Sequence, residues 1–170
     1  TQIIQLGEGE KASELFTQTD LMPLQNFWVE LKESGMISRT ESDKQSRLGG
    51  VNSPWQILRT NSHQNAYLVT TSGKAAAISS LSIPSQVQFE EGKKASQISP
   101  LGDEDFVQAI FTVPMERDEL PERYVVSVSR KGMIKRSLVT ELPGASASSF
   151  VLARINDDDE LLTVFLTKGG

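Results

Sequence analysis

Apolar and polar residues alternate on both sides of a glycine at three places in this chain, in residues 29–39, 67–77 and 126–136. In each copy, apolar residues stand four and six positions before the glycine and two positions after it. The glycines are Gly35, Gly73 and Gly132, and their apolar neighbours are Leu31, Val29 and Ile37, then Val69, Tyr67 and Ala75, then Val128, Val126 and Ile134. Alternation with period two predicts half-buried strands, and glycine permits the positive φ of a tight turn. The pattern therefore predicts three similar β-hairpins.

The repeat extends beyond the hairpins. Ile83-Pro84 and Leu142-Pro143 follow Gly73 and Gly132 at the same offsets, and acidic turns at 102–105 and 157–160 each lead into an apolar strand. One unit is roughly 55–60 residues, near the ~40–50 residues of a four-stranded propeller blade. Almost no segment shows a sustained 3.6-residue period, so we predict an all-β protein with about three blades.

The amino-acid composition excludes some kinds of site. The 170 residues carry a net charge of −5 and include no cysteine, which excludes disulfides and thiolate metal sites. Basic residues gather at the hairpins, whereas acidic residues gather in the turns between the repeats. Because salt screens charges over about 8 Å, a net-acidic protein can still present a local basic edge. No apolar run approaches the length of a membrane span, so we expect no membrane partner.

The order of these motifs resembles the C-terminal domain of the DNA gyrase A subunit, to which topoisomerase IV has a related domain. The segment Tyr124-Val-Val-Ser-Val-Ser-Arg-Lys-Gly-Met-Ile-Lys-Arg-Ser137 is similar to that family's blade hairpin, and Asp158-Asp-Glu-Leu161 to its turn between blades. Asn61-Ser-His63, leading to Thr71-Ser-Gly73, resembles the turn and hairpin of its second blade. The match covers roughly residues 20–170.

The resemblance implies a β-pinwheel, in which four-stranded blades form a propeller-like wheel and neighbours exchange a strand. Full domains of this kind have five or six blades. We therefore expect a truncated pinwheel over residues 26–170, preceded by a linker from an upstream core in residues 1–25. The start at Thr1 and the stop directly after a strand-like run also fit an excised fragment.

In this family the outer rim of the wheel binds and bends duplex DNA, through Lys and Arg contacts to phosphates rather than base reading. The resemblance transfers this role to basic positions at blade edges and in the loops that follow. These positions are Arg39, Lys44, Arg47, Lys74, Lys93, Lys94, Arg130, Lys131, Lys135 and Arg136. Lys93 and Lys94 fall in a polar segment, residues 85–96, that we read as a loop.

Gyrases also carry a basic, glycine-rich box after the first hairpin, which is needed to wrap DNA. The matching residues are Lys44, Gln45, Ser46, Arg47, Leu48, Gly49 and Gly50. Only Lys44 and Arg47 are basic and no lysine trails the glycines, so this box is degenerate. The parent protein is then a gyrase with altered wrapping, a topoisomerase IV-like enzyme or a diverged paralogue.

No Ser-His-Asp set or paired carboxylates stand out, and His63 has no second metal ligand nearby in sequence. We expect no catalytic group, metal, cofactor or small-molecule substrate in this chain. The resemblance implies a cytoplasmic, nucleoid-associated, ATP-dependent parent enzyme, with ATP on a partner subunit and Mg²⁺ in the core. Its partners would be double-stranded DNA, the rest of the A subunit and the ATPase subunit. The alternative is a propeller-like module that binds protein and has lost DNA wrapping.

Overall fold

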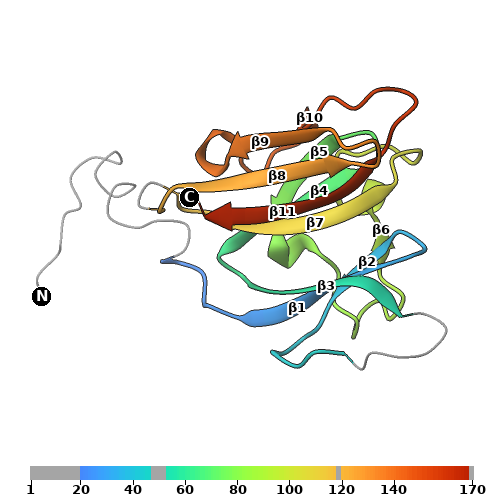
Figure 1. Cartoon of the computed structure of the whole chain (residues 1–170). Coiled ribbons are helices and arrows are strands. Elements are labelled where there is room, and N and C mark those ends of the chain that lie inside the picture. The colour runs from blue at the N-terminus through green and yellow to red at the C-terminus, as the bar shows by residue number, and fades with distance from the viewer. Residues whose placement is uncertain (1–19, 47–52, 118–119, 169–170) are drawn as a thin grey trace, which may run out of the picture.

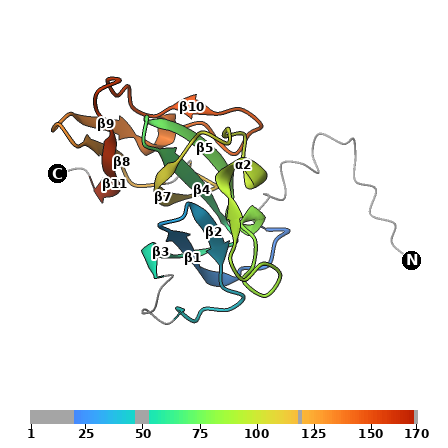
Figure 2. The same ribbon diagram turned by 90° about the vertical axis from the view of Figure 1, so that its right-hand side faces the viewer.

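Three antiparallel sheets form the folded part of the chain in a computed structural model that describes residues 20–46, 53–117 and 120–168 (Figure 1). The sheets fan out like adjacent blades (Figure 2). The strands are β1 (Asn26–Lys32), β2 (Met36–Arg39), β3 (Pro54–Asn61), β4 (Gln64–Thr70), β5 (Lys74–Ser79), β6 (Lys93–Lys94), β7 (Val107–Pro114), β8 (Arg123–Ser129), β9 (Ile134–Leu138), β10 (Phe150–Val151) and β11 (Leu161–Lys168). Three short helical turns, η1 (Ser80–Ser82), α2 (Ala95–Ile98) and η2 (Val139–Glu141), complete the described elements.

The three predicted hairpins are confirmed. They are β1–β2, β4–β5 and β8–β9, and each turn contains one of the predicted glycines. Gly35, Gly73 and Gly132 have φ values of 83°, 85° and 88°, in the left-handed region that residues with a Cβ rarely adopt.

Neighbouring sheets exchange strands. The first sheet has the order β3-β1-β2-β6 and the second the order β10-β5-β4-β7. In each sheet one outer strand, β6 in the first and β10 in the second, comes from beyond the next hairpin along the chain, which ties the sheets together. The sequence interpretation of residues 85–96 as a loop was wrong at its end, because Lys93 and Lys94 form β6 and α2 begins at Ala95.

The third sheet has three described strands, in the order β11-β8-β9, rather than the predicted four. The strand β10, which follows the third hairpin, pairs with β5 of the second sheet instead. Among the described residues, therefore, β9 pairs only with β8. The all-β pinwheel class is confirmed, and the difference is confined to this one edge.

Two apolar clusters occupy the spaces between the sheets. Leu31 and Ile37 of the first sheet pack with Leu68 of the second, on one side of β4. Tyr67, on the other side of β4, packs with Val125 of the third sheet. The period-two alternation of β4 thus supplies both clusters, because successive side chains point to opposite faces of a strand.

Two glutamines connect the strands β3, β7 and β11, which lie side by side. The Gln56 side chain donates to the carbonyl oxygen of Ile110 (2.6 Å) and accepts from its N–H (2.9 Å). Gln108 donates to the carbonyl oxygen of Leu162 (3.2 Å). Sequence reasoning did not identify these bridges, because an isolated Gln in a strand carries no signal of its partner.

Residues 20–25, the described end of the predicted linker, dock on the turn between β3 and β4. Ser62 N–H donates to the carbonyl oxygen of Gln25 (2.9 Å), and the His63 ring lies 2.6 Å from the carbonyl oxygen of Met22. The contact between His63 and Met22 therefore helps to hold residues 20–25 against this turn. In the part of the chain that the structure describes, no helix is long and apolar enough to cross a membrane.

Candidate nucleic-acid interface

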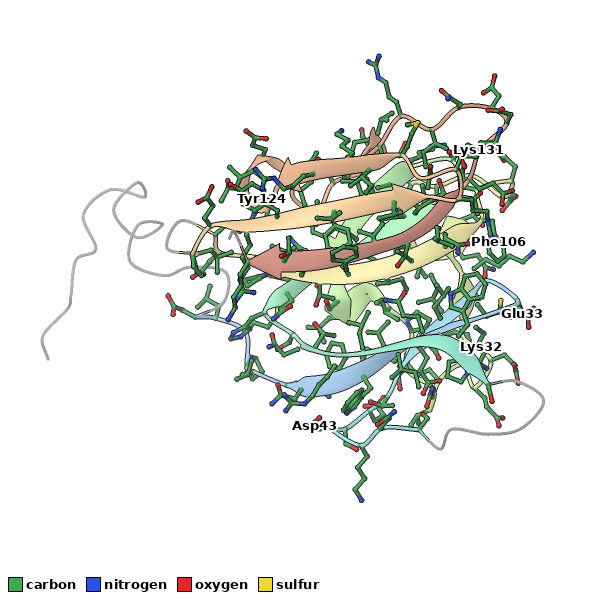
Figure 3. All side chains as sticks on the ribbon, viewed as in Figure 1. Lys32, Glu33, Asp43, Phe106, Tyr124 and Lys131 are labelled. Atoms are coloured by element: carbon green, nitrogen blue, oxygen red, sulfur yellow. The ribbon has the colours of Figure 1, made fainter. Side chains whose placement is uncertain are left out.

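The glycine turns of the hairpins lie at one end of the molecule. Lys32, Glu33, Phe106 and Lys131 mark this end, and Tyr124 lies toward the other (Figure 3). Because all three hairpins run in the same direction in this fan, basic residues that flank their turns are brought to a common end of the wheel.

Each hairpin turn holds at least one cation in an ion pair with a carboxylate. Lys32 pairs with Glu91 (3.1 Å) and Lys74 with Asp105 (2.7 Å) at the first two turns. At the third turn, Arg130 pairs with Glu160 (3.3 Å) and Lys131 with Asp158. The sequence predicted the basic and acidic groups separately but not their pairing, because the partners lie far apart in the sequence and only the fold brings them together. A phosphate that approaches these cations must compete with carboxylates.

The Lys74–Asp105 pair is the most enclosed of these, because the Asp105 side chain is only 10% exposed. Burial opposes ionisation of Asp105, but the Lys74 ammonium and the N–H of Gly102 outweigh it and hold the pKa of this carboxyl below its usual range. The same pair raises the pKa of Lys74. We conclude that Lys74 makes a structural contact with the turn that leads into β7 of its own sheet.

The third turn is organised by Asp159, whose side chain accepts from the N–H groups of Lys131 (3.0 Å) and Glu160 (2.8 Å). A hydrogen bond from Ser129 and these two N–H groups lower the pKa of Asp159. This carboxylate therefore fixes the backbone from which Arg130 and Lys131 project, while both of those side chains remain 56% exposed.

Three further cations have no carboxylate partner in the described contacts: Lys135 and Arg154 lie near this turn, and Arg136 lies farther along β9, toward Tyr124. Lys135 donates to the carbonyl oxygen of Leu152 (2.6 Å), and the Arg136 guanidinium lies 4.1 Å from the centre of the Tyr124 ring. Arg154, which sequence reasoning missed, shares with Lys135 the wall of a small hollow of about 80 Å³. We call the set the third-sheet basic edge; it consists of Arg130, Lys131, Lys135, Arg136 and Arg154.

The predicted cations of the first sheet are less available. The Arg39 guanidinium donates to the carbonyl oxygen of Ile83 (3.0 Å) and lies over the Phe27 ring at 5.1 Å. Lys93 lies 4.1 Å from the centre of the Phe89 ring, whereas Lys94 is exposed. The structure thus brings together the third-hairpin cations, but it does not join Arg39 to them in one surface.

The degenerate box lies only partly within the described residues. Lys44 and Gln45 are exposed, and the Ser46 hydroxyl donates to the Gln86 side chain (3.3 Å). Arg47, Leu48, Gly49 and Gly50 lie outside the described residues.

The loop that leads into the box is attached to the first sheet through Asp43. This carboxylate accepts two hydrogen bonds from Arg59, at 2.8 and 2.5 Å, and one from the Trp28 indole at 3.1 Å. The Arg59 contact lowers the pKa of Asp43.

Comparison with known proteins agrees with this architecture. No family model matches the chain. The gyrase A subunit of Clostridium acetobutylicum is 27% identical over 94% of the chain and 20% of that protein. The solved C-terminal domain of DNA topoisomerase IV matches with a TM-score of 0.68 at 18% identity, over 87% of this chain and 47% of that one. The DNA gyrase A C-terminal domain matches with a TM-score of 0.59 at 17% identity, over 85% and 48%.

The chain spans about a fifth of the length of the curated relatives it matches. The expected resemblance is confirmed: the chain is similar in sequence to gyrase A subunits over nearly all its length, and it has the β-pinwheel fold of the C-terminal domains of gyrase A and topoisomerase IV.

Proposed function

We propose that this chain is a DNA-binding part of a type IIA topoisomerase A-type subunit, and that it holds duplex DNA by phosphate contacts on the third-sheet basic edge. The observation that carries the proposal is the gathering of five cations at the third hairpin and along β9, in a chain whose net charge is −5. The similarity to gyrase A subunits supports it.

Phosphate binding without base reading suits this surface. Arg136 is held over an aromatic ring and Lys135 by a carbonyl oxygen, which orders both cations without neutralising them. Ordered cations lose less side-chain entropy when they bind a phosphate. Arg130 and Lys131 contribute less, because their exposed ion pairs must open first, and such pairs are worth up to about 1 kcal/mol each.

In this proposal, other parts of the enzyme carry out the catalytic reaction. The parent would pass one duplex through a break in another, with ATP on its partner subunit and Mg²⁺ in its core. This chain would retain and orient DNA for that reaction. A contribution of Lys44 and Arg47 of the degenerate box to DNA binding is part of the same proposal.

The test is duplex binding by single charge reversals with a matched control. We expect Lys135→Glu and Arg136→Glu to weaken binding to a 40-base-pair duplex at low salt about tenfold each, since each loses one phosphate contact. Lys168→Glu makes the same charge change at the end of the third sheet away from the hairpin turn, where β11 pairs with Arg123, and should have a smaller effect than Lys135→Glu. Equal effects of all three would mean that only the net charge matters, and would contradict a defined edge.

A second pair of variants should act in the opposite direction. Asp158→Asn and Glu160→Gln remove the carboxylates that engage Lys131 and Arg130. Because each exposed ion pair is worth up to about 1 kcal/mol, releasing it should tighten DNA binding up to about fivefold. Unchanged binding would remove these two cations from the proposed edge.

The alternative, a protein-interaction module, is favoured by a different observation on the same sheet. Ile134 and Phe165 are 71% and 48% exposed. An apolar surface of this kind is typical of a protein contact. The two proposed functions can be distinguished by charge-reversal variants, because DNA binding depends on the cations and an apolar protein contact does not.

A further inference from the structure

The loop of residues 41–46, which follows β2 and contains the start of the degenerate box, is held in place by polar contacts. Five of its six residues are exposed, so burial of apolar area contributes little to its position. The Ser85 hydroxyl donates to the Glu41 carboxylate at one point, and the Asp43 carboxylate accepts hydrogen bonds from the first sheet at another. The position of this loop therefore depends on a small number of hydrogen bonds.

Three N–H groups converge on the Asp43 carboxylate. Trp28 of β1 and Arg59 of β3 are directly opposed in the antiparallel pairing, so their side chains lie on one face of the sheet. The Trp28 indole donates at 3.1 Å, and the Arg59 guanidinium donates through Nε at 2.8 Å and through Nη2 at 2.5 Å. Contact with both carboxylate oxygens fixes the orientation of the group as well as its position. Asp43 is thereby held against the strands beside which it lies in Figure 3.

Lys44, the first residue of the degenerate box, follows Asp43 directly and is exposed. Consecutive Cα atoms are about 3.8 Å apart, so a fixed Asp43 confines the backbone of Lys44. The N–H of Lys44 also donates to the carbonyl oxygen of Ser42 (2.7 Å), which closes a tight turn around Asp43. The direction in which the Lys44 side chain leaves the loop is therefore set by the Asp43 contacts.

The acidic residue at this place has a different role from the acidic residues of the third hairpin. There, Asp158 engages Lys131, which is itself one of the cations proposed to bind phosphate. Here, Asp43 engages Arg59 of the sheet and leaves the Lys44 side chain without a carboxylate partner in the described contacts. Removing the carboxylate should therefore release a phosphate-binding cation in the first case, but release the whole loop in the second.

We propose that Asp43 is a positioning residue for DNA binding: it holds the loop so that Lys44 faces a phosphate, and it strengthens binding to duplex DNA despite its negative charge. This inference rests on the proposed function, because it requires that Lys44 contacts DNA. When the loop is released, the duplex must order it again on binding. Ordering one backbone residue costs about fivefold to thirtyfold in affinity, which exceeds the gain from removing one screened charge.

Alanine substitution at two acidic positions of the first sheet tests the sign of this effect. Asp43→Ala removes the carboxylate and its contacts, and Glu33→Ala makes the same charge change at the hairpin-turn end of the same sheet (Figure 3). Affinity for a duplex of about 40 base pairs is measured at low salt by fluorescence anisotropy. We expect Asp43→Ala to weaken binding at least about threefold, whereas Glu33→Ala should leave it unchanged or slightly tighter.

Two further variants show whether the effect acts through the loop. Trp28→Phe removes one donor to Asp43 without changing the net charge, and it should weaken binding about twofold. Lys44→Glu should weaken binding about tenfold in the unsubstituted chain but less than about threefold when combined with Asp43→Ala, because the released loop no longer presents this residue. Urea titration checks that each variant has the unfolding midpoint of a folded protein.

The outcomes separate this inference from the proposed function. Tighter binding by Asp43→Ala, or an effect equal to that of Glu33→Ala, would overturn the inference, because affinity would then follow net charge. Equal effects of Lys44→Glu with and without Asp43→Ala would overturn it as well. If Lys135→Glu weakens binding and Asp43→Ala does not, the proposed function stands and only this inference fails. Absence of DNA binding by the unsubstituted chain would overturn both.

Discussion

Substituting two of the hairpin glycines by alanine tests how closely the exchanged segments are seated. Gly73 and Gly132 have nearly the same φ, 85° and 88°, so the backbone penalty for alanine is the same at both. Their surroundings differ, because a Cβ at Gly73 would lie 2.0 Å from the carbonyl oxygen of Ala153 and one at Gly132 would meet nothing. Comparing the two alanine variants therefore separates the cost of backbone strain, which both share, from the cost of disturbing the contact with the next blade, which only Gly73→Ala has.

The expected magnitudes follow from these contacts. Alanine in the left-handed region costs about 1–2 kcal/mol, which is the whole effect expected for Gly132→Ala. At Gly73 the carbonyl oxygen also accepts from the N–H groups of Leu152 (3.0 Å) and Ala153 (3.2 Å). Moving this segment away loses both hydrogen bonds, at about 1 kcal/mol each. We expect Gly73→Ala to lower the free energy of unfolding by about 3–4 kcal/mol.

Urea titration followed by circular dichroism measures both values, at one protein concentration and with the unsubstituted chain as reference. A larger loss at Gly73 than at Gly132, by about 2 kcal/mol, would support the described seating of β10 and the residues after it. Equal losses would refute the reasoning, because they would mean that the segment from Phe150 does not rest on the second hairpin.

Further predictions concern contacts between the sheets. Tyr67→Phe removes the hydroxyl that donates to Pro143 (2.7 Å) and should lower the free energy of unfolding by about 1 kcal/mol in the same titration. Gln56→Ala leaves a backbone N–H and C=O of β7 without their partner and should cost about 1–3 kcal/mol; no loss would mean that water replaces the side chain. The lowered pKa of Asp105 means that its ion pair with Lys74 stabilises the fold above the unfolded carboxyl pKa of about 3.9, and that this stability is lost as pH falls through the lower folded value. Asp105→Asn should therefore reduce the dependence of stability on pH in the acid range, and an unchanged acid limb would contradict it.

The fold was largely predictable because its main determinants are local. Alternation around Gly35, Gly73 and Gly132 fixes the hairpins, and the repeat of those hairpins indicates blades. The exchange of strands was seen only through the family resemblance, since the two-residue strand at Lys93 is too short to show a period. Gly92 marks the exchange in the sequence once its geometry is known, because it has a φ of +83° and a Cβ there would lie 2.4 Å from the carbonyl oxygen of Ile37.

The candidate site was less predictable for a similar reason. Positions such as Arg130 and Arg39 look alike in the sequence, since each is a cation near a hairpin. Their difference is tertiary, because Arg39 is turned onto the Phe27 ring and a carbonyl oxygen, whereas Arg130 remains exposed. Arg154 was missed because the strand that places it beside Lys135 belongs to another sheet.

The salt dependence of duplex binding tests the central claim most directly. The affinity of this chain for a 40-base-pair duplex is measured by fluorescence anisotropy between 50 and 200 mM salt, conditions over which phosphate contacts give a slope near −0.9 for each contact. Three to five contacts on the third-sheet basic edge predict a loss of about 40- to 500-fold over this range, and a shallower slope for Lys135→Glu. Absence of binding at 50 mM salt, or an affinity that does not change with salt, would contradict the account.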